Sequence, residues 1–356
     1  MSPAGRAVPG LFPGAVEAFD RGGMLALVGS LGTQLREGYA AATATPALPS
    51  AEGVRSILIC GMGGSGIGGD VFRSLYGPTL AVPVVVTKGY SLPGFAGRDT
   101  VVIVASFSGN TEESVAAYTA AVERGCRVVA VSAGGALASL AEADGLPHLR
   151  LPDHVPLPRA ALGYLAAAPI GIADALGLIP PAADDVERTA SLLDDLAGRL
   201  GPDGGDPSAK GLAGWLGGRI PVVWGSEGVA EAAALRWKTQ TNENGKLPAW
   251  ASVLPELDHN EIEGWSVGVG TPFALIVLRH PGEHPRVEAR VTATLDLLRA
   301  SGLDARQVHA EGSTPMGWLF SLIMLGDFVT TYEAIGRGVD PTPIPVLSAL
   351  KERLKP

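Results

Sequence analysis

The segment that most constrains the fold of this chain is a run of glycines, "ICGMGGSGIGGD", over residues 59–70. It holds six glycines in twelve positions and follows an apolar run that starts at Ile57. Glycine loses more conformational freedom on folding than any other residue, so this density needs a reason. Two reasons are open: a tight turn between a strand and a helix, or a ligand that lies against the backbone.

Short β-branched runs and helical patterns alternate from Ser56 onward. "TEESVAAYTAAVERG" has apolar residues at helical spacing, with Gly125 placed as its C-terminal stop. The alternation returns after residue 210, where "WGSEG" stands in the place of "CGMGGSG". The pattern predicts an α/β protein with two doubly wound domains, each a parallel sheet flanked by helices.

The length of 356 residues also favours two domains. We expect a helical segment over 1–50, a first domain over 51–180 and a helix with a Pro/Gly-rich linker over 181–210. A second domain over 211–340 and a helical tail over 341–356 complete the prediction. Gly, Pro or acidic residues interrupt the apolar runs at 160–176 and 316–336, and the N-terminus lacks a continuous apolar stretch. We therefore predict no membrane span and a cytoplasmic location.

Charge and cysteine usage restrict the partners. The formal net charge is -9 and no Lys/Arg-rich run occurs, which argues against nucleic acid. Cys60 and Cys126 form neither a CxxC pair nor a zinc pattern, and no other residues have metal-ligand spacing. The expectation is two free thiols in a reducing compartment and no bound metal.

A dinucleotide site is one alternative for the glycine run, because Gly61, Gly63 and Gly66 satisfy G-x-G-x-x-G. That site also needs an acidic residue about 20 positions later, which binds the ribose. No Asp or Glu lies between Val71 and Arg98, and no Lys stands where a Walker-type loop has one. Dinucleotide binding is therefore a distant alternative.

The segment "ASFSGNTEES" favours a phosphate instead. It places three hydroxyl groups after the run "VVIVAS", at the predicted start of a helix: Ser106, Ser108 and Thr111. Asn110 and Glu113 have the spacing of an N-cap and the third helical residue. Hydroxyls and free backbone N–H groups at the positive end of a helix bind anions without a lysine. Ordinary capping is the alternative, and a phosphate monoester is the preferred interpretation.

Five segments together resemble the bifunctional phosphoglucose/phosphomannose isomerases, which carry two sugar-isomerase (SIS) domains. In chain order they are "GMGGSGIGGD", "SFSGNTEE", "PRAALGYL", "RWKTQTNENGK" and "PELDHNEIEGW". The resemblance runs from about residue 50 to the end. It implies a homodimeric enzyme that needs no cofactor and interconverts glucose 6-phosphate and/or mannose 6-phosphate with fructose 6-phosphate through a cis-enediol.

The resemblance also implies a role for particular residues. Glu243 would be the general base, His259 would open the sugar ring from a neighbouring subunit, and Arg159 would stabilise the enediolate. Lys351 would assist ring opening, with Lys355 as the other candidate. Gly63, Gly64 and Ser65 would bind the substrate phosphate together with the three hydroxyls of the second loop.

Other functions remain open at this stage. A non-catalytic SIS-type regulator would need the phosphate site but no base, so Glu243, His259 and Arg159 argue against it. An isomerase of another phosphosugar would fit the same residues. The sequence does not decide between glucose 6-phosphate and mannose 6-phosphate.

Overall fold

The computed structural model describes residues 14–266, 272–299 and 302–354. Its first sheet is parallel, with the strand order β2-β1-β3-β4-β5. The strands are β1 (Ser56–Gly61), β2 (Val84–Thr87), β3 (Thr100–Ala105), β4 (Arg127–Ser132) and β5 (His148–Arg150). Because the chain reverses its direction of winding between β1 and β3, their carboxyl ends form the switch point where such sheets bind ligands.

The second sheet repeats this arrangement with the order β7-β6-β8-β9, again all parallel. Its strands are β6 (Ile220–Ser226), β7 (Trp250–Leu254), β8 (Phe273–Arg279) and β9 (Ala305–His309). The predicted α/β class with two doubly wound sheets is confirmed. The short strand β7 was not predicted, because it carries no β-branched run of ordinary length.

Side chains of the first sheet alternate between two cores, as the period of a strand requires. Ile57 and Ile59 point into a large core, under α4 (Gly63–Tyr76) and α7 (Leu162–Ala175). Leu58 and Cys60 point into a smaller core. That core lies under α5 (Glu112–Glu123) and α6 (Gly135–Ala143).

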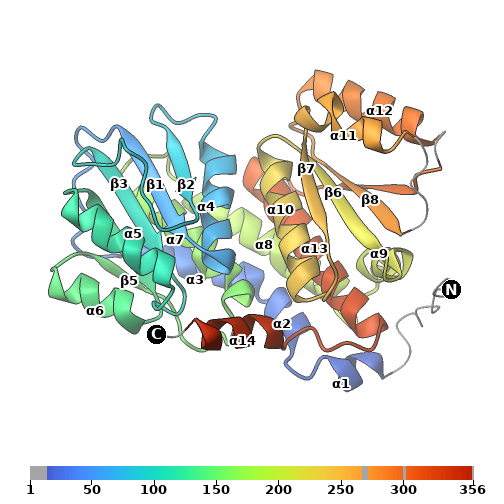
Figure 1. Ribbon diagram of the computed structural model, residues 1–356, viewed down its shortest axis with the longest axis horizontal. Coiled ribbons are helices and arrows are strands. Elements are labelled where there is room, and N and C mark those ends of the chain that lie inside the picture. The colour runs from blue at the N-terminus through green and yellow to red at the C-terminus, as the bar shows by residue number, and fades with distance from the viewer. Residues whose placement is uncertain (1–13, 267–271, 300–301, 355–356) are drawn as a thin grey trace.

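The second sheet divides in the same way. Val223 joins the large core, which α9 (Ser208–Leu216), α10 (Val229–Glu243) and α13 (Pro315–Gly336) complete. Trp224 belongs to a third core, under α11 (Glu261–Gly264) and α12 (Pro285–Arg299). The large core is therefore shared by both sheets, and Figure 1 shows α4, α8 and α10 between them.

The remaining helices pack around this shared core. They are α1 (Ala15–Phe19), α2 (Met24–Gly29), α3 (Leu31–Thr43), α8 (Ala183–Leu200) and α14 (Pro345–Arg353). Close packing of α3 on α7 uses Gly38, where a Cβ atom would lie 2.9 Å from the Cα of Tyr164. By contrast, α14 has no buried residue and lies at the periphery of the molecule (Figure 1).

One helix of the described chain, α13, is long and apolar enough to cross a membrane. However, 94% of its apolar window is buried inside the fold. Length and burial together are those of a central core helix, which also carries buried polar residues such as Asp327 and Glu333.

Candidate active site

Most glycines of the run at 59–70 are required by packing. A Cβ at Gly68 would lie 2.3 Å from the carbonyl oxygen of Leu165, and one at Gly64 would lie 2.8 Å from the carbonyl carbon of Pro158. Gly61, Gly66 and Gly69 would meet protein atoms at 3.0, 2.7 and 2.9 Å. Only Gly63 of the six has open space around its Cβ position, at a φ of +52°. Close contacts with β1, with α7, with Pro158 and with Ala105 thus explain five glycines, and Gly63 alone has open space at its Cβ position.

The glycine turn and the serine loop meet at the switch point of the first sheet. Gly61, the last residue of β1, is paired with Ala105, the last residue of β3. The backbone N–H of Phe107 donates a hydrogen bond of 3.0 Å to Oγ of Ser65, which is buried. Because Ser65 accepts this bond, it ties the two loops together and keeps its own hydroxyl proton for another acceptor.

The three predicted hydroxyls lie within one compact loop. Oγ of Ser106 donates to Oγ1 of Thr111 at 2.9 Å, and the N–H of Asn110 donates to Oγ of Ser108 at 3.3 Å. Gly109 has a φ of +71°, and a Cβ there would lie 1.7 Å from the carbonyl oxygen of Gly134. The loop is therefore held by internal hydrogen bonds and by close packing on the loop after β4, with Ser106 buried and Ser108 exposed.

The predicted cap of α5 is wrong by one residue. The N-cap is Thr111, whose side chain makes no capping hydrogen bond, and the helix begins at Glu112. Asn110 instead accepts a hydrogen bond of 2.9 Å from the N–H of Ala136 at the start of α6. Since this contact depends on the neighbouring loop after β4, local spacing could not predict it.

Arg159 lies in a short 3-10 helix, η1 (Pro158–Ala160), and is 2% exposed. Its Nε donates to Oδ1 of Asn244 at 2.8 Å, and its Nη2 donates to the carbonyl oxygens of Pro341 and Thr342 at 3.0 and 2.7 Å. Burial lowers the pKa of Arg159 and the Glu243 carboxylate opposes this shift. A guanidinium remains protonated under such conditions, so the site contains a fixed positive charge.

Glu243 is the last residue of α10. Its Oε2 lies 3.6 Å from Nη1 of Arg159, and 25% of its side chain is exposed. Gly64 of the glycine turn packs directly on the Pro158–Arg159 peptide. The structure therefore brings together one predicted residue from the phosphate turn, the predicted arginine and the predicted base.

Lys246 is a member of this cluster that the sequence analysis missed. Its Nζ donates to the carbonyl oxygen of Glu243 and, at 2.9 Å, to that of Pro341. Burial, and secondarily the charge of Arg159, lowers the pKa of Lys246 to about 8. Its place in the "NENGK" segment was a signal, but its backbone φ of +52° turns the chain in a way the spacing does not predict.

The predicted ring-opening residues are not part of this cluster. His259 ends the 3-10 helix η2 (Glu256–His259) and is exposed. Its neighbour Asp258 is buried against α12, with Oδ2 3.3 Å from Nη1 of Arg290. Lys351 lies exposed on α14, and Lys355 falls outside the described residues. Within the described ranges, no hydrogen bond or ion pair joins His259 or Lys351 to Arg159 or Glu243.

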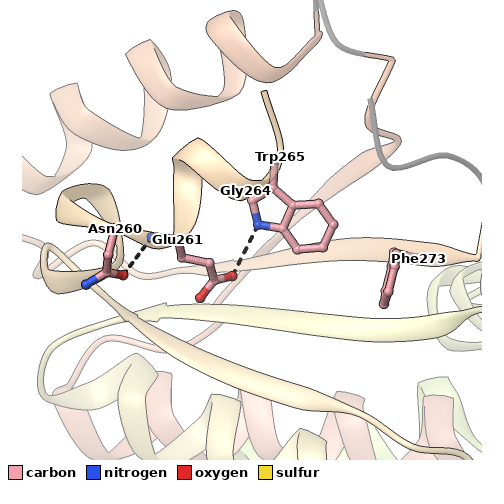
Figure 2. A pocket seen from close by; sticks show the side chains of 5 residues that line it. All are labelled: Asn260, Glu261, Gly264, Trp265 and Phe273. Atoms are coloured by element: carbon pink, nitrogen blue, oxygen red, sulfur yellow. Dashed lines mark hydrogen bonds between the residues drawn. The ribbon is translucent and has the colours of Figure 1, made fainter. Parts of the chain in front are cut away.

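A cavity of about 360 Å³ lies beside the segment that carries His259. Figure 2 shows its lining: Asn260, Glu261, Gly264, Trp265 and Phe273. The carboxylate of Glu261 accepts hydrogen bonds from the indoles of Trp224 and Trp265 at 2.8 and 3.3 Å. None of the predicted site residues lines this cavity, and its one carboxylate is already bound. No three or more His, Cys, Asp or Glu side chains of the described chain form a group that could hold a metal ion.

The second half of the chain matches a known protein family. Residues 206–354 match the family described as the bacterial phospho-glucose isomerase C-terminal SIS domain. The fold matches a hypothetical protein from Thermus thermophilus with a TM-score of 0.72 and 16% identity, over 95% of this chain and 92% of that one.

Curated relatives cover nearly the whole chain. The bifunctional phosphoglucose/phosphomannose isomerase of Caldicellulosiruptor bescii is 35% identical, over 93% of this chain and 98% of its own. The protein of the same description from Aquifex aeolicus is 33% identical, over 85% and 91%. A D-glucosamine-6-phosphate 4-epimerase from Sulfolobus acidocaldarius is 30% identical, over 65% and 71%. The chain belongs to the family of bifunctional phosphoglucose/phosphomannose isomerases.

Proposed function

We propose that this protein interconverts glucose 6-phosphate and/or mannose 6-phosphate with fructose 6-phosphate through a cis-enediol. The observation that carries the proposal is the contact between Arg159 and Glu243, 3.6 Å apart, beside the glycine turn. Aldose–ketose isomerisation needs a carboxylate base and a fixed positive charge near the same two carbons. Family membership supports the same reaction.

The proposed chemistry assigns one step to each group. The carboxylate of Glu243 removes the C2 proton of the open aldose and returns a proton to C1. The proton of the C2 hydroxyl passes to the aldehyde oxygen, so that C2 becomes the ketose carbonyl and the aldehyde oxygen becomes the C1 hydroxyl. Arg159 faces the oxygen that becomes negatively charged in between. The phosphate binds Ser106, Ser108 and Thr111 on one loop, and Gly63, Gly64 and Ser65 on the other. It serves as a handle, since it does not change during the reaction.

Ring opening is assigned to His259 and Lys351, and this assignment requires a second subunit. His259 is exposed, whereas its neighbour Asp258 contacts Arg290 of α12. Exposed apolar side chains on α14 and at its C-cap support a homodimer: Val346, Leu347, Leu350 and the cap residue Leu354. A second copy that covered these side chains would place Lys351, which lies on the same helix, near the subunit interface.

The remaining proposals follow from the family and the sequence. We expect a cytoplasmic enzyme that uses neither a metal nor an organic cofactor, because a carboxylate and a guanidinium supply the charges that the reaction needs. Activity that survives EDTA would support this, and loss of all activity in EDTA that zinc restores would contradict it.

A coupled assay of the purified protein with glucose 6-phosphate, mannose 6-phosphate and fructose 6-phosphate tests the proposed function. The proposal predicts turnover of at least one aldose to the ketose. A protein that binds these sugars without turnover would be the regulator considered above. This chain is also similar to an epimerase of an amino sugar phosphate. Turnover of glucosamine 6-phosphate alone would therefore indicate another phosphosugar enzyme.

A further inference from the structure

A buried ion pair joins α10 to α13 behind the candidate site. Nε and Nη2 of Arg236 lie 3.0 and 2.8 Å from the two carboxylate oxygens of Asp327. The side chains are 3% and 5% exposed. Transferring two charges from water to an interior costs several kcal/mol each, which the pairing roughly offsets. Such a pair contributes little to stability compared with apolar residues of the same size. Its presence therefore suggests a role other than stabilising the fold.

Arg236 has a third partner that indicates this role. Its Nη2 also donates a hydrogen bond of 2.7 Å to the carbonyl oxygen of Arg159. The guanidinium thus links a carboxylate on α13 to the main chain of η1, from which the Arg159 side chain projects. Bonds from a charged donor are shorter and stronger than neutral ones, so this contact restricts the position of η1.

A second connection runs from the same helix to the Arg159 side chain. Asn244, which is fully buried, accepts the Nε–H of Arg159 at 2.8 Å, and its own amide lies 3.5 Å from Oγ1 of Thr331. Oγ1 of Thr331 in turn donates to the carbonyl oxygen of Asp327 at 2.7 Å. Polar residues of α13 therefore contact the surroundings of Arg159 on both its main-chain and its side-chain ends.

We propose that the Arg236–Asp327 pair positions Arg159 against Glu243. The pair does not touch substrate; it fixes the main chain of η1 so that the guanidinium faces the base. This inference rests on the proposed function for its kinetic consequence, but its structural consequence can be measured without any substrate.

The test replaces the pair by apolar residues of similar volume, in the double variant R236M/D327L. A packed apolar pair maintains the contact between α10 and α13 and removes the bond to Arg159. We expect kcat to fall by about 10- to 100-fold with KM within about twofold, because Arg159 acts on the transition state while the phosphate loops are unchanged. A value of kcat equal to that of the wild type in a folded double variant would overturn the proposal.

A second buried pair provides the matched control. Arg279 and Glu283 form a bidentate contact in the second sheet, with Nη2 and Oε2 2.7 Å apart and exposures of 10% and 5%. No hydrogen bond or ion pair joins either residue to η1 in the part of the chain that the structure describes. R279M/E283L should change thermal stability by a similar amount and leave kcat unchanged. Equal losses of kcat in the two double variants would show that the effect is general destabilisation and would contradict positioning.

A double-mutant cycle identifies the residue through which the pair acts. If the pair acts through Arg159, then R159A combined with R236M/D327L should be no slower than R159A alone. If the fold-losses in kcat of R159A and of R236M/D327L multiplied in the combined variant, the pair would act independently of Arg159. If R236M/D327L does not fold, R236K replaces it, because an ammonium group lacks the planar fork with which the guanidinium binds both carboxylate oxygens and the Arg159 carbonyl.

The crystal structure of the variant separates this inference from the proposed function. We expect Arg159 to lose its 3.6 Å approach to Glu243 while β1, β3 and their loops superimpose on the wild type. An unmoved Arg159 would overturn the positioning role. If the wild-type protein turned over no hexose 6-phosphate, the proposed function would fail, and the position of Arg159 would still decide this inference.

Discussion

Nη1 of Arg159 lies 3.6 Å from Oε2 of Glu243, although the two residues belong to segments that pack around different sheets. Arg159 follows the last strand of the first sheet, and Glu243 ends the helix that follows β6 of the second. The pair exists only because both sheets share one large core. A reaction that uses both residues therefore depends on the contact between the two halves of the chain.

The phosphate loops give the first prediction. S108A and T111A should each lower kcat/KM by roughly 10- to 150-fold, since a hydrogen bond to a charged group contributes about 1.5–3 kcal/mol. Most of the loss should appear in KM, because the phosphate is bound alike in the ground and transition states. Steady-state kinetics with fructose 6-phosphate measures this. Wild-type kinetics in both variants would place the phosphate elsewhere.

Lys246 predicts opposite pH effects on activity and stability. Its folded pKa is about 8 and its ordinary value is 10.5, so above pH 8 the folded chain releases a proton that the unfolded chain retains. Stability should therefore rise with pH between 8 and 10.5 at this residue. In the same range kcat should fall, because the site loses a positive charge near the enediolate.

Two variants check the origin of this pH effect. K246R stays charged, so the decline in kcat should move to higher pH, while K246M should show no step near pH 8. The pH profile of kcat with saturating substrate is the measurement. An unchanged alkaline limb in both variants would exclude Lys246 as its source.

Replacing Gly64 by alanine should lower the stability of the fold and also disturb the candidate active site. In G64A the new Cβ would lie 2.8 Å from the carbonyl carbon of Pro158, so the η1 backbone must shift. We expect about 1–3 kcal/mol of destabilisation, as for other overpacked positions, together with lower kcat. The control is G198A on α8, where nothing lies within 4 Å and where alanine should stabilise by about 0.5–1 kcal/mol. Urea unfolding measures both; equal stability of the two variants would contradict the packing argument.

His259 predicts complementation between subunits. H259A should be slow with closed-ring substrate and faster with an analogue that cannot cyclise, whereas E243Q should be slow with both. If His259 serves the neighbouring subunit, co-expressed H259A and E243Q chains should recover about a quarter of wild-type activity, because half of the dimers carry one complete site. No recovery in isolated mixed dimers would place His259 in the site of its own subunit or outside any site.

The sequence predicts the sheets and the segments of the site better than it predicts their contacts. The short apolar runs around Ile57 and Val223 predict buried strands in two sheets. The spacing of residues within each motif can also be read from a single segment of the sequence. The approach of Glu243 to Arg159 depends instead on the packing of α4 and α10, which no local pattern encodes. The glycine run illustrates the same limit: Gly68 is needed because the Leu165 backbone lies against it, and Leu165 is distant in the sequence.

Exchange of the substrate C2 proton with solvent in E243Q tests the central claim most directly. The amide keeps the shape of the side chain but cannot accept a proton, and general-base catalysis contributes about 10²–10⁴-fold. With glucose 6-phosphate or mannose 6-phosphate in deuterated water, NMR should show loss of both exchange and turnover by at least that factor, with KM nearly unchanged. Exchange at the wild-type rate in folded E243Q would contradict the assignment of Glu243 as the base.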